Sequence, residues 1–205
     1  MLGYKELFEM RLKKCKFFLV EKQGCKYFLL SYLNHNSAEM EYNTVRVLHL
    51  RKMHVPKIVQ MADNDLILDY VEGSTMYEDL AQGATFKFGM IATAFVKMMR
   101  EFETYFPGKR VGNVDLRGYI VKGSLLYSFD FDCIISGGVL DTVADCILAV
   151  MAEKGIAKER QVAFCRLLAK ASGADKSAMK QALAPLLPLC PSVQWSLDQL
   201  VDTIL

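Results

Sequence analysis

Two short runs of hydrophobic residues near the start of the chain indicate a β-hairpin. Residues 16–21 and 26–33 are rich in aromatic and aliphatic side chains, and a Lys-Gln-Gly-Cys turn separates them. Apolar runs on either side of a glycine-containing turn are typical of paired strands. Asn36 then precedes Glu39 by three residues, a spacing that can cap a helix, and the helical pattern continues to about Arg51. The pattern predicts a hairpin followed by a helix.

A second hairpin is predicted after Pro56, which ends the helical pattern. The apolar runs 57–61 and 66–71 flank the polar turn Ala-Asp-Asn-Asp. Polar and flexible residues between two strand-like runs favour a turn. Glu72 and Gly73 interrupt the second run, so we expect the strand-rich part of the chain to end there.

The rest of the chain has mainly helical periodicity. Apolar residues recur three and four positions apart along one predicted helix, at Phe88, Ile91, Ala92, Phe95, Met98, Met99 and Phe102. Pro107 and Gly108 end that helix, and the pattern from 111 to 131 is extended and broken by turns. The helical period returns at Val139. The helical region therefore contains one short strand-rich interruption.

Strands that precede helices favour an α+β fold over a doubly wound sheet. The predicted division is a strand-rich part with one helix over residues 1–72 and a helical part with a small hairpin over residues 73–205.

Composition narrows the classes of function. The 205 residues are 52% hydrophobic and 23% charged, which is typical of a globular chain and not of a disordered one. A net charge of +2 gives no reason to expect nucleic acid or an anionic membrane as a partner. The six cysteines form no Cys-x-x-Cys pair, so neither zinc nor a disulfide framework is predicted. No apolar stretch is long enough to span a bilayer and the N-terminus resembles no signal peptide, so we expect a soluble, cytoplasmic protein.

Four segments carry candidate chemistry. They are, in chain order, Glu41 on the apolar face of the predicted helix, the strand and turn Leu-Ile-Leu-Asp-Tyr-Val-Glu-Gly at 66–73, the loop Gly-Asn-Val-Asp-Leu-Arg-Gly-Tyr-Ile-Val at 112–121, and Ser-Phe-Asp-Phe-Asp-Cys at 128–133. In this order they resemble the aminoglycoside/choline phosphotransferase group. The resemblance covers roughly residues 15–150, and it implies a two-lobed protein-kinase-like fold with a small strand-rich N-lobe and a helical C-lobe.

The resemblance implies that ATP and Mg²⁺ bind between the lobes. In the family, a helix glutamate corresponding to Glu41 pairs with a strand lysine that holds the nucleotide phosphates. The backbone of a linker corresponding to Asp69, Tyr70 and Val71 binds the adenine.

The resemblance also implies roles for acidic residues in the second half of the chain. Asp130 would hold Mg²⁺, and Asp132 would hold a second ion or remain solvated. Asp141, at the start of a predicted helix, would support the catalytic loop from below, and capping its own helix is the local role expected of it in either case.

The sequence departs from the family pattern at the strand lysine. Ser31 occupies the expected position of this lysine, and Ser31 carries no charge that would neutralise phosphate. Lys22 and Lys26 lie nearby, and we take Lys26 as the candidate replacement.

The catalytic loop has two possible registers. Counting back from Asp130 places Asn113 at the position of the catalytic carboxylate and Gly118 at that of a metal-binding asparagine. The other register uses Asp115 as the catalytic carboxylate and places Ile120 at the asparagine position. The first register lacks both the carboxylate and the asparagine, and the second lacks the asparagine, so the catalytic set is incomplete in either register.

The sequence therefore predicts a kinase-like protein that binds a nucleotide or a protein partner with weak or lost catalysis. Survival of the acidic residues supports an alternative, an active Mg-ATP phosphotransferase that acts on an unknown small hydroxylated molecule. A second alternative is an unrelated α+β binding protein.

Overall fold

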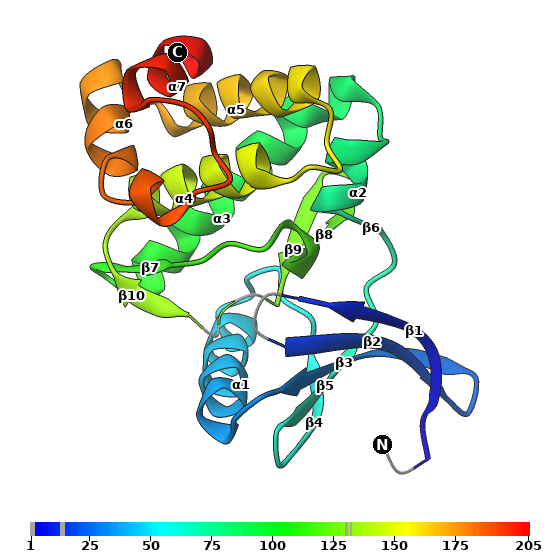
Figure 1. The fold of residues 1–205 in the computed structure, drawn as a ribbon. Coiled ribbons are helices and arrows are strands. Elements are labelled where there is room, and N and C mark those ends of the chain that lie inside the picture. Colours follow the sequence, from blue (N-terminus) through cyan, green and yellow to red (C-terminus); the bar gives the residue numbers. More distant parts are fainter. Residues whose placement is uncertain (1–2, 13–14, 130, 132) are drawn as a thin grey trace.

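The computed structural model describes residues 3–12, 15–129, 131 and 133–205. A strand-rich sheet with one helix forms the N-terminal part, and a group of helices forms the C-terminal part (Figure 1). The α+β prediction is confirmed at this level, and the arrangement is compatible with two lobes.

The N-terminal part is built on one antiparallel sheet with the strand order β1-β2-β3-β5-β4. Its strands are β1 (Lys5–Arg11), β2 (Cys15–Lys22), β3 (Cys25–Tyr32), β4 (Ile58–Ala62) and β5 (Asp65–Asp69). Both predicted hairpins are present, as β2–β3 and β4–β5. The sequence pattern missed β1, a strand at the sheet edge whose side chains are mostly exposed.

The two faces of the sheet bury different residues. Phe28 and Leu30 of β3 point to the face that packs on the C-terminal part, whereas Leu29 packs with Phe18 and Val20 on the other face. Strand side chains alternate between faces, so Ser31 points the same way as Leu29.

Helix α1 (His35–Leu50) follows β3 and lies against the sheet (Figure 1). The side chain of Asn34 caps this helix by accepting a hydrogen bond of 2.9 Å from the Ser37 N–H. The predicted cap by Asn36 is therefore wrong by two residues, because a cap must lie outside the first helical turn. The buried side chains of α1 include Glu41, Val45 and Leu48.

The C-terminal part contains the remaining elements. The helices are α2 (Met76–Ala81), α3 (Phe88–Tyr105), α4 (Val139–Ala152), α5 (Lys158–Ser172), α6 (Lys176–Leu183) and α7 (Leu197–Ile204). The seven apolar residues predicted to share one face of a helix are all buried in α3. They join one large core with residues of α4, α5, α6 and α7.

Short strands hold the loops at the boundary between the two parts. These strands are β6 (Ser74–Thr75), β7 (Lys109–Val111), β8 (Tyr119–Lys122), β9 (Leu125–Ser128) and β10 (Ile134–Ser136). They form a sheet of order β6-β8-β9 and a β7–β10 pair. Gly73 is needed where the linker meets β8, because a Cβ atom there would collide with the backbone oxygen of Val121.

Among the described residues, no helix combines the length and apolar character that a membrane span requires.

Candidate functional site

Glu41 joins the N-terminal part to the segment that follows β9. Its side chain is fully buried, and Oε2 accepts a hydrogen bond of 2.7 Å from the backbone N–H of Phe131. A buried carboxylate is costly unless hydrogen bonds satisfy it, so this contact fixes α1 against the 128–133 segment. The prediction that Glu41 points inward is confirmed.

The loop between β7 and β8 is held from α4. Asp145 Oδ2 accepts a hydrogen bond of 2.6 Å from the Asn113 N–H, and the same oxygen lies 3.1 Å from a guanidinium nitrogen of Arg110. The side chain of Asn113 is exposed, and its φ of 56° is left-handed, a conformation that asparagine tolerates better than most residues. Asp145 thus fixes the backbone of the loop at Asn113.

Asp141 contacts the first turn of the helix in which it lies. Its Oδ2 accepts a hydrogen bond of 2.9 Å from the Gly138 N–H at the start of α4. Asp141 therefore caps its own helix, which was one of the two roles considered for it. The supporting contact comes from Asp145, one helical turn further along. Sequence spacing alone missed Asp145, because residues i and i+4 lie on the same helix face.

Asp115 is buried in a network of charged groups. It is 4% exposed, and its Oδ1 accepts a hydrogen bond of 3.0 Å from the Arg117 N–H. The Arg117 guanidinium donates to both oxygens of Glu153, at 2.8 and 3.1 Å, and stacks on Tyr77. The hydrogen bond to Glu153 raises the pKa of Arg117 above its ordinary value. Asp115 therefore has a structural role in shaping this turn.

Gly118 lies beside the segment that carries the predicted metal ligands. Its backbone oxygen accepts a hydrogen bond of 3.2 Å from the Phe129 N–H, one residue before Asp130 in the chain. Gly118 was the residue counted to the asparagine position in the register that uses Asn113. Gly118 and Asn113 are therefore both held by hydrogen bonds of their backbones.

Ser31, Lys22 and Lys26 are the hairpin residues considered for the role of the strand lysine, and each has its own surroundings. Leu30, which is fully buried, points to the face of β3 that α1 covers, and Ser31 points to the other face. Ser31, which was counted to the position of the strand lysine, therefore lies on the side of β3 away from α1. Lys26 lies over the Tyr70 ring at 5.6 Å, and Lys22 lies over the Tyr4 ring at 4.7 Å.

The backbone groups of the linker residues Asp69, Tyr70 and Val71 are not equally free to bind a ligand. The Asp69 N–H donates to the Lys57 oxygen at 2.8 Å, so this donor is already used within the sheet. Tyr70 packs edge-on against Phe28 at 5.2 Å, and Val71 is buried. Tyr70 and Val71 remain as the candidate positions for a ligand at the linker.

Three rings fill the corner between the sheet and the linker. We call Phe17, Phe28 and Phe129 the aromatic cluster, and each of its side chains is at most 5% exposed. Phe17 and Phe129 stack at 5.4 Å between ring centroids, and Phe28 lies 5.5 Å from Phe129. These separations are those of direct aromatic contact, about 4.5–7 Å, so no third ring lies between them. Val71 and Ile120 belong to the same buried group.

The predicted metal ligands Asp130 and Asp132 lie outside the described residues. Within the described part of the chain, no three His, Cys, Asp or Glu side chains are grouped so that they could hold a metal ion. Phe131, between the two aspartates in sequence, is the residue that Glu41 anchors. Two carboxylates next to an anchored backbone are chemically suited to a hard cation such as Mg²⁺.

Comparisons with known proteins identify no family. The chain matches no protein-family profile and no curated protein. A solved structure that resembles it is the complex of Rv3197 with erythromycin from Mycobacterium tuberculosis, with a TM-score of 0.51 and 11% sequence identity. The match covers 91% of this chain and 61% of that chain, so this chain spans less than two thirds of that protein. At this identity the likeness concerns the fold alone.

Proposed function

We propose that this chain has a two-lobed, protein-kinase-like fold and acts by binding, with phosphoryl transfer weak or lost. The order of the elements supports the fold proposal. Five antiparallel strands carry one helix between β3 and β4, and a linker then leads to the helical part. The glutamate that the resemblance places on that helix, Glu41, is buried, and it holds the backbone at Phe131.

The main support for a loss of catalysis is that the loop residue held by Asp145 is an asparagine, Asn113. Asp145 fixes the loop at Asn113, where the resemblance implies a catalytic carboxylate. Phosphoryl transfer depends on groups that orient the acceptor hydroxyl and stabilise charge, and asparagine does not accept a proton in that role. The apolar Leu30 removes a cation from the same site. Losing one stabilising group of this kind costs roughly 10²–10³ in rate.

Weak nucleotide binding follows from the aromatic cluster. Val71 is buried in one group with this cluster and Tyr70 packs against it, so we propose that a base at the backbone of Tyr70 or Val71 displaces part of the cluster. Exposing a buried phenylalanine costs about 1.5–3 kcal/mol, which lowers the affinity of any ligand that requires it. Asp130 and Asp132 would hold Mg²⁺ together with the phosphates of a nucleotide that enters. We therefore expect an ATP site of low affinity.

Thermal unfolding with and without millimolar Mg-ATP tests this proposal. A ligand present near its dissociation constant stabilises the folded state by about 0.4 kcal/mol, which corresponds to a shift of about 1 °C for a chain of this size. We expect a shift no larger than this, and none in Asp130→Ala. A shift of several degrees would instead require a dissociation constant about 100-fold below the ATP concentration. That result would contradict weak binding and favour an active phosphotransferase.

A further inference from the structure

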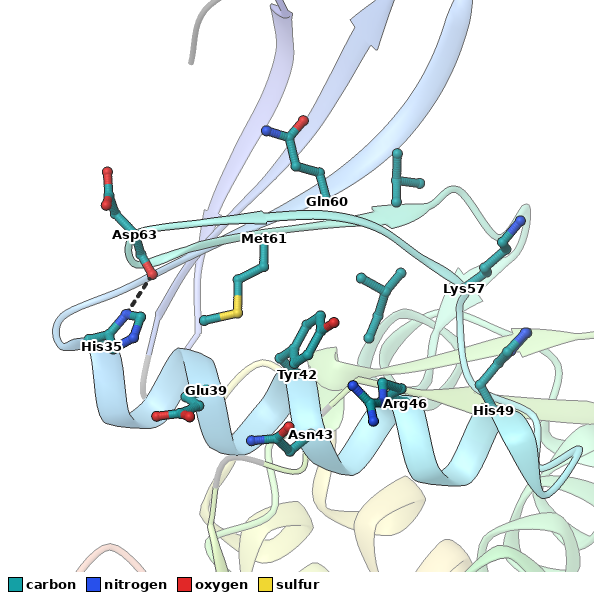
Figure 2. Close-up of a pocket in the computed structure, with 12 residues that line it drawn as sticks. His35, Glu39, Tyr42, Asn43, Arg46, His49, Lys57, Gln60, Met61 and Asp63 are labelled. Atoms are coloured by element: carbon teal, nitrogen blue, oxygen red, sulfur yellow. Dashed lines mark hydrogen bonds between the residues drawn. The ribbon is translucent and has the colours of Figure 1, made fainter.

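The outer face of α1 forms one side of a groove that the proposed function does not use. The groove has a volume of about 760 Å³, and β4 and the residues next to it form its other side (Figure 2). Tyr42, Ile58 and Met61 are partly exposed in it, and Val59 is 43% exposed. The groove therefore has an apolar middle section that is accessible from outside.

Cations gather at one end of this groove. Arg46 and His49 come from the last turns of α1, and Lys57 comes from the residue before β4 (Figure 2). All three are exposed, and none forms a salt bridge with another of the described residues. Two permanent positive charges and an imidazole without a carboxylate partner favour an anionic group at this end.

The opposite end of the groove carries acidic side chains. Glu39 and Asp63 lie there, and the Asp63 backbone oxygen is 2.8 Å from His35 Nδ1, a contact that joins α1 to the β4–β5 turn (Figure 2). A polyanion such as nucleic acid or an anionic bilayer would meet these carboxylates along with the cations. A peptide of mixed charge avoids this repulsion.

The length of the groove also suits a short peptide. His49 lies ten positions after Glu39 in α1, which corresponds to about 15 Å along the helix axis. An extended peptide covers that distance in about five residues, at roughly 3.3 Å per residue.

We infer that this groove binds a short extended segment of a protein partner. The segment carries acidic side chains at the end that meets Arg46, His49 and Lys57, an aromatic or aliphatic side chain in the middle, and a basic residue near Glu39. Because none of the residues that line the groove belongs to the proposed nucleotide site, this inference does not depend on nucleotide binding. An apolar anchor beside complementary charges is a common mode of peptide recognition.

Fluorescence anisotropy with a labelled Lys-Leu-Phe-Asp-Glu-Glu peptide tests the inference on the full chain. The matched probe is Lys-Leu-Phe-Asn-Gln-Gln, which has nearly the same shape without the acidic charges. We expect saturable binding of the acidic peptide and at least about tenfold weaker binding of the neutral one. The double variant Arg46→Glu/Lys57→Glu should lose at least about tenfold, equivalent to about 1.4 kcal/mol. Met61→Asp should weaken both peptides.

Lys122→Glu is the control, because Lys122 is an exposed cation on β8, outside the groove. It makes the same change of charge as one substitution in the groove and should leave binding unchanged. Circular dichroism of each variant establishes that it is folded. Equal binding of the two peptides, or an equal loss in Lys122→Glu, would overturn the inference. Binding to vesicles with anionic lipids that depends on Arg46 and Lys57, without peptide binding, would also overturn it.

Discussion

The segment around Phe131 and the loop around Asn113 are each held through a backbone N–H by a carboxylate, but they differ in the side chains that they carry. The first carries Asp130 and Asp132 in sequence, and Glu41 anchors its backbone at Phe131. The second is anchored equally well, by Asp145 at Asn113, but has no carboxylate at that position. Contacts that hold the backbone are present in both segments, whereas the residue held in the second, Asn113, carries no carboxylate, and the Asp115 carboxylate of that loop accepts a hydrogen bond from the Arg117 N–H.

An active site needs contacts that hold its backbone in shape and also side chains that take part in the chemistry, and these two requirements can be met separately. A buried hydrogen bond from a carboxylate to a backbone N–H stabilises the fold whether or not catalysis occurs. A catalytic acid or base contributes nothing to stability and is often destabilising. A binding protein built on this fold needs the first kind of contact and not the second.

The largest expected effect on stability comes from Glu41→Ala. The substitution leaves the buried N–H of Phe131 without its acceptor and creates a cavity under α1. We expect unfolding by urea to show a loss of about 3 kcal/mol. Glu39→Ala, an exposed site on the same helix, should change stability by less than about 0.5 kcal/mol. Similar losses in the two variants would show that Glu41 is not an anchor.

A smaller effect is expected for the anchor of the other loop. Asp145→Ala removes the acceptor for Asn113 and the partner of Arg110, and should cost about 2 kcal/mol. Asp141→Ala removes only a helix cap and should cost about 1 kcal/mol. Chemical denaturation of both variants checks this order. The reverse order would restore Asp141 as the residue that supports the loop.

A double-mutant cycle tests whether the site has kinase-like geometry. Leu30→Lys places a cation on the face of β3 that α1 covers, where the resemblance implies a partner for Glu41. The lysine should be tolerated better when Glu41 is present than in Glu41→Ala, with a coupling energy of about 1 kcal/mol. Leu29→Lys, on the opposite face, should show no coupling to Glu41. Equal coupling at both positions would contradict the proposed geometry.

The smallest effect is expected at Lys26. This lysine contacts the Tyr70 ring beside the linker and lies on the surface, so Lys26→Ala should cost about 0.5 kcal/mol of stability. Because the ammonium group lies over the Tyr70 ring, we do not expect Lys26 to hold phosphate. Lys26→Ala should therefore change the Mg-ATP shift in the unfolding temperature only a little. Loss of the entire shift in Lys26→Ala would show that Lys26 holds phosphate after all.

The main elements could be predicted from the sequence where a strong hydrophobic period exists. The buried face of α3 and the two hairpins follow from such patterns. Strand β1 could not be predicted, because an edge strand with exposed side chains has no clear alternation of apolar residues.

Single residues of the site were harder to place because they depend on register. Ser31 and Leu30 differ by one position, and one position along a strand reverses the face of the sheet. Asp141 and Asp145 share a helix face, and only the packing of α4 on β7 decides which one reaches the loop. The aromatic cluster brings together rings from β2, β3 and the end of β9, so no local pattern reveals it.

Consumption of radiolabelled ATP by the purified chain measures whether phosphoryl transfer is weak or lost. The measurement compares the natural sequence with Asp130→Ala and Asp115→Asn, over long incubations with Mg²⁺ and a broad set of hydroxylated acceptors. We expect the natural chain to consume ATP no faster than either variant. Consumption that both substitutions reduce by about 100-fold or more would contradict it and would identify Asp115 as a catalytic carboxylate.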